Sequence, residues 1–204
     1  MEDGMDMKRL IVAITGASGA IFGIRALELL RKRDDIETHL VISPSGLRTI
    51  VSETDHGIDQ VRALAHRVYN PKDIGASISS GSFVTAGMLI APCSIKTLSG
   101  IANSYDEGLV VRAADVCLKE RRRLVLMLRE TPLHGGHIEL MARANAAGAI
   151  IMPPVPAFYH RPASLMDIVD QSVGRALDLF GIPLPETKRW HGETKAPEIG
   201  KSFS

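Results

Sequence analysis

The sequence predicts an α/β protein with a single domain built on a doubly wound parallel sheet. Short apolar runs rich in β-branched residues recur along the chain, and segments with helical spacing separate them. Apolar runs without alternation are typical of strands that a parallel sheet buries on both faces. The length of 204 residues suits one compact domain.

The first unit is predicted to be a strand, a glycine turn and a helix. Residues 10–14 form a continuous apolar run, and Gly16-Ala-Ser-Gly19 follows it. Apolar residues then recur at helical spacing over 20–30, until the charged segment 31–35 ends the pattern.

The same alternation continues along the chain. Residues 38–42 predict a second strand, and Ser43-Pro44 predicts a helix that begins with an N-cap serine and a proline at its first position. We expect further strands and helices at these positions: strands 88–91, 124–128 and 149–152, and helices 96–102, 108–122, 136–147 and 164–180.

No linker divides this pattern, so we expect one domain over residues 1–190 and a polar tail over 191–204. The proline cluster 153–156 is incompatible with a helix and predicts a rigid, extended arm.

Charge and cysteine content exclude several classes of protein. The 24 Lys and Arg residues nearly balance the 23 Asp and Glu residues, which argues against a protein that coats nucleic acid or an acidic membrane. Cys93 and Cys117 form neither a disulfide framework nor a zinc motif. The apolar run after Arg9 is too short for a secretory signal or a membrane span, so we expect a cytoplasmic protein.

Polar residues follow the predicted strands, where open parallel sheets bind their ligands. The Gly16–Gly19 loop is a candidate phosphate cradle, although it lacks the dinucleotide fingerprint, and a turn without a ligand is the alternative. Ser94, Lys96 and Thr97 suit a phosphate or the polar edge of a ring, while helix capping alone also explains the two hydroxyls. The adjacent charges of Arg129-Glu130 indicate either a crevice site or a surface ion pair.

Two other charged motifs have plainer explanations. The run from Lys119 to Arg123 is typical of a solvated helix end, with Lys119 as a candidate exception. His134 and His137 are three residues apart without a third ligand, which favours a loop or a first helical turn over a metal site.

Five motifs together resemble the UbiX family of flavin prenyltransferases. The resemblance runs in order from about residue 8 to residue 190. Its motifs are Gly16-Ala-Ser-Gly19, Ile78-Ser-Ser-Gly-Ser-Phe83, Pro92-Cys-Ser-Ile-Lys-Thr97, Arg129-Glu-Thr-Pro132 and Pro153-Pro-Val-Pro-Ala-Phe-Tyr159.

This resemblance implies a flavodoxin-like Rossmann fold, a three-layer sandwich that binds reduced FMN and needs no metal. The implied reaction transfers a dimethylallyl group from dimethylallyl phosphate to the flavin. Prenylated FMN would then pass to a UbiD-type aromatic acid decarboxylase. The family also implies a homo-oligomer, a dodecamer.

The resemblance also implies roles for individual residues. The expected FMN-binding residues are Gly16, Ala17, Ser18, Ser43, Ser94, Ile95, Lys96, Thr97 and Arg129. The expected residues for dimethylallyl phosphate are Arg112, Lys119, Glu130, Tyr159 and Arg175. Catalytic roles fall to Ser18, Glu130 and Lys119. Tyr159 and Arg175 are separated by a proline arm and a helical segment, so we expect them to complete the site of a neighbouring subunit.

Two other functions remain open at this point. One is an accessory subunit that binds FMN without catalysis, although a second set of anion-binding residues is unnecessary for such a carrier. The other is a flavoprotein related to cysteine decarboxylases, which would need a catalytic histidine and an asparagine-containing segment where this chain has Pro92-Cys-Ser-Ile-Lys-Thr97.

Overall fold

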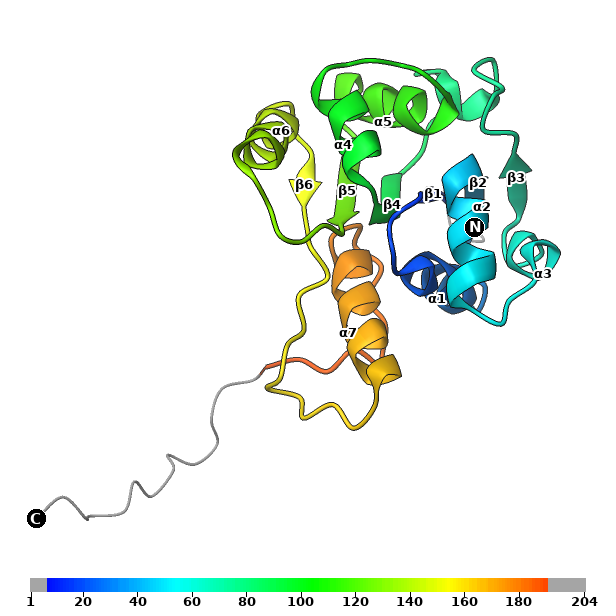
Figure 1. The fold of residues 1–204 in the computed structure, drawn as a ribbon. Helices are drawn as coiled ribbons and strands as arrows, with labels where there is room; N and C mark the ends of the chain where they lie inside the picture. The colour runs from blue at the N-terminus through cyan, green and yellow to red at the C-terminus, as the bar shows by residue number, and fades with distance from the viewer. Residues whose placement is uncertain (1–6, 191–204) are drawn as a thin grey trace, which may run out of the picture.

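A parallel sheet of six strands forms the centre of the computed structural model, which describes residues 7–190 (Figure 1). Its strands are β1 (Lys8–Ile14), β2 (Ile36–Ile42), β3 (Arg67–Tyr69), β4 (Gly87–Cys93), β5 (Arg123–Leu128) and β6 (Ile150–Ile151). Their order in the sheet is β3-β2-β1-β4-β5-β6. Without the short edge strand β3, this order is that of a flavodoxin-like sheet, so the predicted fold class is confirmed.

Helices cover both faces of the sheet and make three layers (Figure 1). The helices are α1 (Ala20–Leu30), α2 (Pro44–Glu53), α3 (Ile58–Arg62), α4 (Ile95–Ala102), α5 (Leu109–Lys119), α6 (Gly135–Ala146) and α7 (Leu165–Asp178). One core contains buried side chains of α1 and α7, and the other contains those of α4, α5 and α6.

The apolar run of β1 is explained by these two cores. Leu10, Val12 and Ile14 belong to the core beneath α1 and α7, whereas Ile11 and Ala13 belong to the core beneath α4 and α5. All five residues are almost fully buried. A strand between two helical layers has no solvent face, so every position is apolar.

Most predicted elements agree with the structure, with differences at their ends. The helix at 20–30 is confirmed, and Ser43 is confirmed as an N-cap because its Oγ accepts the Gly46 N–H at 3.0 Å. The prediction of a helix to residue 122 was wrong at its end: α5 stops at Lys119, and Arg121 has a φ of 55°. The strand expected at 149–152 is only two residues long.

A segment without helix or strand leads from β6 to α7 and extends away from the sheet, as the proline cluster predicted (Figure 1). Of the helices in the described range 7–190, none has the length and apolar character needed to cross a membrane. The polar tail expected at 191–204 lies outside the described residues.

Candidate functional site

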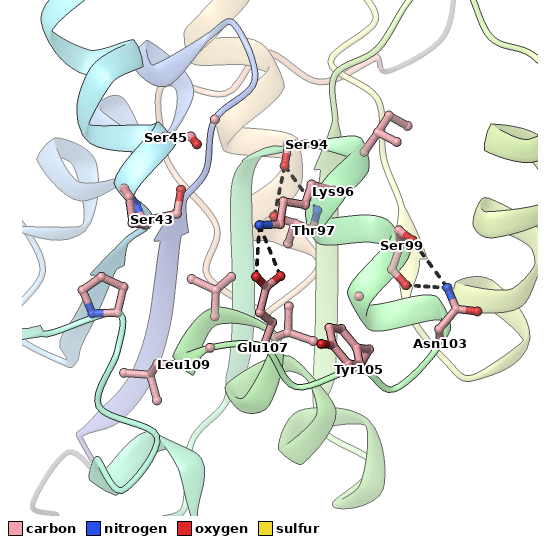
Figure 2. A pocket seen from close by; sticks show the side chains of 18 of the residues that line it. Ser43, Ser45, Ser94, Lys96, Thr97, Ser99, Asn103, Tyr105, Glu107 and Leu109 are labelled. Carbon is pink, nitrogen blue, oxygen red and sulfur yellow. Dashed lines mark hydrogen bonds and ion pairs between the residues drawn. The ribbon is translucent and has the colours of Figure 1, made fainter.

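A cleft of about 1070 Å³ opens at the carboxyl ends of the strands, where the strand order reverses between β1 and β4 (Figure 2). Gly16, Ser43 and Ser94 follow β1, β2 and β4 and line it, and Glu130 reaches it from the end of β5. Six of the expected FMN-binding residues are in the lining: Gly16, Ser43, Ser94, Ile95, Lys96 and Thr97. Of the described residues expected there, the lining leaves out Ala17, Ser18 and Arg129.

Two serines at the cleft cap the helices that begin there. Ser43 caps α2, and the Ser94 Oγ caps α4 by accepting the Thr97 N–H at 3.3 Å. The Ser94 and Thr97 hydroxyls are 3.1 Å apart. Capping of α4 by Ser94 is confirmed, and both hydroxyls also lie in the lining of the cleft, where binding of a phosphate or a ring edge stays a prediction. The N-termini of α2 and α4 add partial positive charge, which favours an anion.

A buried threonine beneath the cleft joins β1 to the start of α4. The Thr15 Oγ1 donates to the Pro92 carbonyl oxygen at 2.7 Å and accepts the Ser94 N–H at 2.9 Å. Its residue is 1% exposed, so this bridge is shielded from water. Thr15 fixes the backbone of Ser94, a role that the sequence motifs did not reveal.

An ion pair crosses the mouth of the cleft (Figure 2). Lys96 Nζ lies 3.2 Å from Glu107 Oε2, and the side chains are 80% and 58% exposed. Glu107 belongs to the loop between α4 and α5, which also contributes Tyr105 to the lining. This loop was not recognised from the sequence because it follows a helix rather than a strand.

The glycine loop is closed by a carboxylate. Gly19 has a φ of 101°, which only glycine adopts easily, and its N–H donates to Glu53 Oε2 at 2.7 Å. Gly16 passes so close to Ser45 that a Cβ would collide with it. An anion at this loop would have to compete with Glu53, so the loop is a less open phosphate cradle than the sequence predicts. Ser18 lies exposed on it.

The groups beside Glu130 are fixed mainly through the backbone. The Arg129 N–H donates to the Cys93 carbonyl oxygen at 3.1 Å, while its side chain is exposed. Glu130 Oε1 accepts the Thr131 N–H at 3.1 Å.

Burial raises the pKa of the Cys93 thiol far above its usual range, so this cysteine is no nucleophile at neutral pH.

Lys119 lies at the amino ends of the strands, whereas Glu130 lies at their carboxyl ends. It ends α5 just before β5 begins, whereas Glu130 follows the last residue of β5. The six residues of β5 span about 20 Å at ~3.3 Å per residue. Lys119 Nζ pairs with Glu120 Oε1 at 2.7 Å, and this contact holds the pKa of Glu120 below its usual value. A single chain therefore does not bring Lys119 and Glu130 together.

Arg112 also engages carboxylates of its own chain. Its guanidinium contacts Asp106 at 3.2 Å and Asp115 at 3.3 Å. Arg112 lies near the start of α5, and the cleft lining extends to Val111 beside it. Both contacts are made through Nη1, and the two acidic partners offset the charge of the guanidinium.

Tyr159 and Arg175 belong to a third group of residues, on α7 and the segments packed against it. We call Tyr159, Gln171, Arg175, Asp178 and Arg189 the arm cluster. Asp178 pairs with Arg175 at 2.7 Å and with Arg189 at 2.7 Å. Hydrogen bonding to Arg189 is the main reason that the pKa of Asp178 is lowered. None of these described residues is in the lining of the cleft.

The two histidines lie at the start of a helix, as predicted. His134 caps α6 by accepting the Gly136 N–H at its Nδ1, and the ring of His137 lies 3.7 Å from that of His134, centroid to centroid. Within residues 7–190, His, Cys, Asp and Glu side chains form no group of three that could hold a metal ion.

Comparisons with known proteins place this geometry in a family. The model of the Flavoprotein family matches residues 2–176. A flavin prenyltransferase UbiX from Escherichia coli (strain K12) is 62% identical over 188 residues, which covers 91% of this chain and all of the relative.

Two solved structures are similar over most of the chain. The crystal structure of AnUbiX (PadA1) in complex with FMN and dimethylallyl pyrophosphate has a TM-score of 0.89 and 50% identity, covering 91% of this chain and 98% of that one. A dodecameric, FMN-dependent UbiX-like decarboxylase from Escherichia coli O157:H7 has a TM-score of 0.88 and 49% identity, covering 90% and 100%. The resemblance noted in the sequence is thereby confirmed: the chain belongs to the UbiX family of flavin prenyltransferases.

Proposed function

We propose that this protein transfers a dimethylallyl group from dimethylallyl phosphate to reduced FMN and produces prenylated FMN. The observation that carries the proposal is a cleft at the switch point of the sheet, lined by hydroxyls and helix N-termini, in a chain of this family. A separate set of cationic side chains supports a second, anionic substrate.

The cleft fits a mononucleotide. Sites for ligands of this size have volumes of roughly 300–1,000 Å³, so about 1070 Å³ accommodates FMN and leaves room for a small second ligand. Ser43, Ser94 and Thr97 offer hydroxyls, and the N-termini of α2 and α4 favour the phosphate. Reduced FMN supplies the electron-rich ring that accepts the dimethylallyl group.

Glu130 is our candidate for proton transfer, because its carboxylate is in the cleft lining. A carboxylate at this position can take up the proton that leaves the reacting ring and then give it to the departing phosphate. Ser18, exposed on the loop after β1, is the second candidate. Backbone donation from Thr131 orients the Glu130 side chain for this task.

Tyr159, Arg175, Lys119 and Arg112 are our candidates for binding the phosphate of the prenyl donor. Guanidinium, ammonium and phenol groups stabilise the negative charge that grows on a departing phosphate. Lys119 and Glu130 lie at opposite ends of the strands. They can share a substrate only if a second copy of the chain supplies Lys119. We therefore place each site between subunits of a homododecamer.

We also propose that a UbiD-type decarboxylase receives the product in the cytoplasm. Prenylated FMN is useful only to an enzyme that uses it as a cofactor, which the family resemblance identifies as a decarboxylase. The two cysteines Cys93 and Cys117 are free and buried, which fits a reducing compartment.

The decisive experiment incubates the protein with reduced FMN and dimethylallyl phosphate under anaerobic conditions. Mass spectrometry of the released flavin should show the addition of one dimethylallyl-derived group, together with release of inorganic phosphate. Parallel reactions with the pyrophosphate identify the preferred donor. A protein that binds FMN but leaves its mass unchanged with both donors would be an accessory carrier instead.

A further inference from the structure

A buried amide, Gln171, links three segments of the arm cluster. Gln171 is 6% exposed, although glutamine is usually found at the surface. Its Nε2 donates to the Tyr159 hydroxyl oxygen at 2.7 Å and to the Lys188 carbonyl oxygen at 2.9 Å. Its Oε1 accepts the Lys188 N–H at 3.2 Å. One side chain of α7 thus holds both the arm and the segment that follows Leu184.

The direction of these hydrogen bonds is fixed by chemistry. The backbone N–H of Lys188 is always a donor, so the amide oxygen of Gln171 must face it. The amide nitrogen must then face Tyr159, and an amide NH₂ group only donates. The Tyr159 oxygen is therefore an acceptor toward Gln171, and its proton points elsewhere.

The phenolic proton of Tyr159 is held only loosely in the described chain. It points to the Lys188 carbonyl oxygen at 3.2 Å, a long distance for an O–H donor. That carbonyl oxygen already accepts a shorter hydrogen bond from Gln171. Tyr159 is 44% exposed, and the Lys188 carbonyl oxygen keeps its hydrogen bond from Gln171 when the phenol turns its proton to an incoming phosphate oxygen.

Resting on the function proposed above, we infer that Gln171 is a positioning residue for the prenyl donor. It acts through Tyr159: by donating to the phenol oxygen, it keeps the phenol proton available for the phosphate. A donated hydrogen bond also polarises the O–H group and makes it a better donor. Gln171 itself is buried and does not touch the substrate.

The packing of the neighbouring segment supports this role. Gly174 lies one turn after Gln171, and a Cβ there would collide with Thr187. Thr187 is itself buried at 8% exposure. The segment that carries Lys188 is therefore seated closely on α7 by packing as well as by Gln171. Because Thr187 also holds this segment, a Gln171 variant can change the orientation of the phenol without releasing the segment from α7.

The test is a double-mutant cycle between Gln171→Glu and Tyr159→Phe. A glutamate keeps the size of the side chain, but its carboxylate accepts the phenol proton and withdraws it from the phosphate. We expect the KM for dimethylallyl phosphate to rise about tenfold, with FMN affinity unchanged, because a hydrogen bond to a charged group is lost. Tyr159→Phe should give a similar rise, and adding Gln171→Glu to it should change KM less than about twofold.

Controls separate this inference from simpler explanations. Gln60→Glu makes the same substitution on α3, where the side chain accepts the exposed Gly57 N–H, and should leave KM unchanged. If Gln171→Glu does not fold, Gln171→Met removes the donor at similar volume and should raise KM severalfold, again only when Tyr159 is present. Equal effects of a Gln171 variant with and without the phenol would overturn the inference. A wild-type protein that forms no prenylated FMN would instead overturn the proposed function.

Discussion

The cleft and the arm cluster offer different kinds of groups to an anion. The cleft presents hydroxyls and backbone N–H groups at the N-termini of α2 and α4, which follow strands that are almost fully buried. The arm cluster presents a phenol and two guanidinium groups on the surface, where the side chains of Arg175 and Arg189 are 51% and 39% exposed. The first set is placed by the backbone and the second by long side chains.

The two regions therefore depend to different degrees on other subunits. Backbone donors at a helix end are already ordered, whereas ordering a long charged side chain costs up to about 2 kcal/mol of entropy. Asp178 reduces this entropy cost because its ion pairs already restrict the side chains of Arg175 and Arg189. We therefore expect the cleft to bind its ligand within one chain, and the arm cluster to act fully only in the assembled oligomer.

The largest effect should come from substitution of Glu130, a candidate residue for dimethylallyl phosphate that lines the cleft. Glu130→Gln keeps the size of the side chain but removes proton transfer, so the ring-closing step should slow by about a hundred- to ten-thousand-fold. Binding of both substrates should persist, and single-turnover absorbance will show the stalled intermediate. Glu139→Gln on the exposed face of α6 is the control. Ring closure at the parent rate would remove Glu130 from the mechanism.

Arg175→Ala tests whether the arm cluster is a site separate from the cleft. Losing one charge-assisted contact costs about 1.5–3 kcal/mol, so kcat/KM for dimethylallyl phosphate should fall roughly ten- to a hundred-fold. FMN affinity, measured by fluorescence titration, should stay the same. Arg62→Ala breaks a similar i,i+3 ion pair on α3 and should leave both quantities unchanged. A parallel loss of FMN affinity would merge the two regions into one site.

Mixing two inactive variants tests whether the sites are shared between subunits. Lys119→Ala removes the candidate residue at the amino ends of the strands, and Glu130→Gln removes the one at their carboxyl ends. When the two proteins are refolded or dissociated together, about a quarter of the sites should contain both intact residues if they come from different copies. Activity should then return toward that fraction. No recovery in a verified mixed oligomer would place both residues in the same chain's site.

The smallest effect should come from the helix caps. Ser94→Ala and Ser164→Ala each remove an N-cap, so each should lower the free energy of unfolding by about 1 kcal/mol and Tm by about 2–4 °C. Only Ser94 lines the cleft, so only its loss should weaken FMN binding, by about two- to tenfold. Equal FMN affinities of the two variants would show that the Ser94 hydroxyl serves the helix alone.

The central sheet could be predicted from the sequence because its strands are buried on both faces. The run at 10–14 and the helix at 20–30 have strong local patterns, and β1 extends the predicted strand by only two residues. The edge strand β3 has no such pattern, since Arg67 and Val68 are exposed and Tyr69 is only partly buried. Pairing with β2 defines β3, and pairing is a long-range property.

The candidate site was predictable where it depends on strand ends, and obscure where it depends on packing. Ser43 and Ser94 follow apolar runs directly, so their positions could be read from the sequence. Glu53 reaches Gly19 across 34 residues because α1 and α2 lie together, which no local signal reports. The distance between Lys119 and the cleft could have been predicted from the sequence. A helix that precedes a parallel strand ends near the amino end of that strand, away from the cleft.

The exposed Lys96–Glu107 pair at the mouth of the cleft is too weak to act as a gate. An ion pair on the surface contributes about 0–1 kcal/mol, close to the thermal energy, so it breaks and forms again within roughly nanoseconds to microseconds. Each time it opens, the Lys96 ammonium is free to attract an approaching anion, and dissolved salt weakens that attraction. The rate of ligand capture should therefore follow diffusion and ionic strength, because the breaking of this ion pair does not limit it.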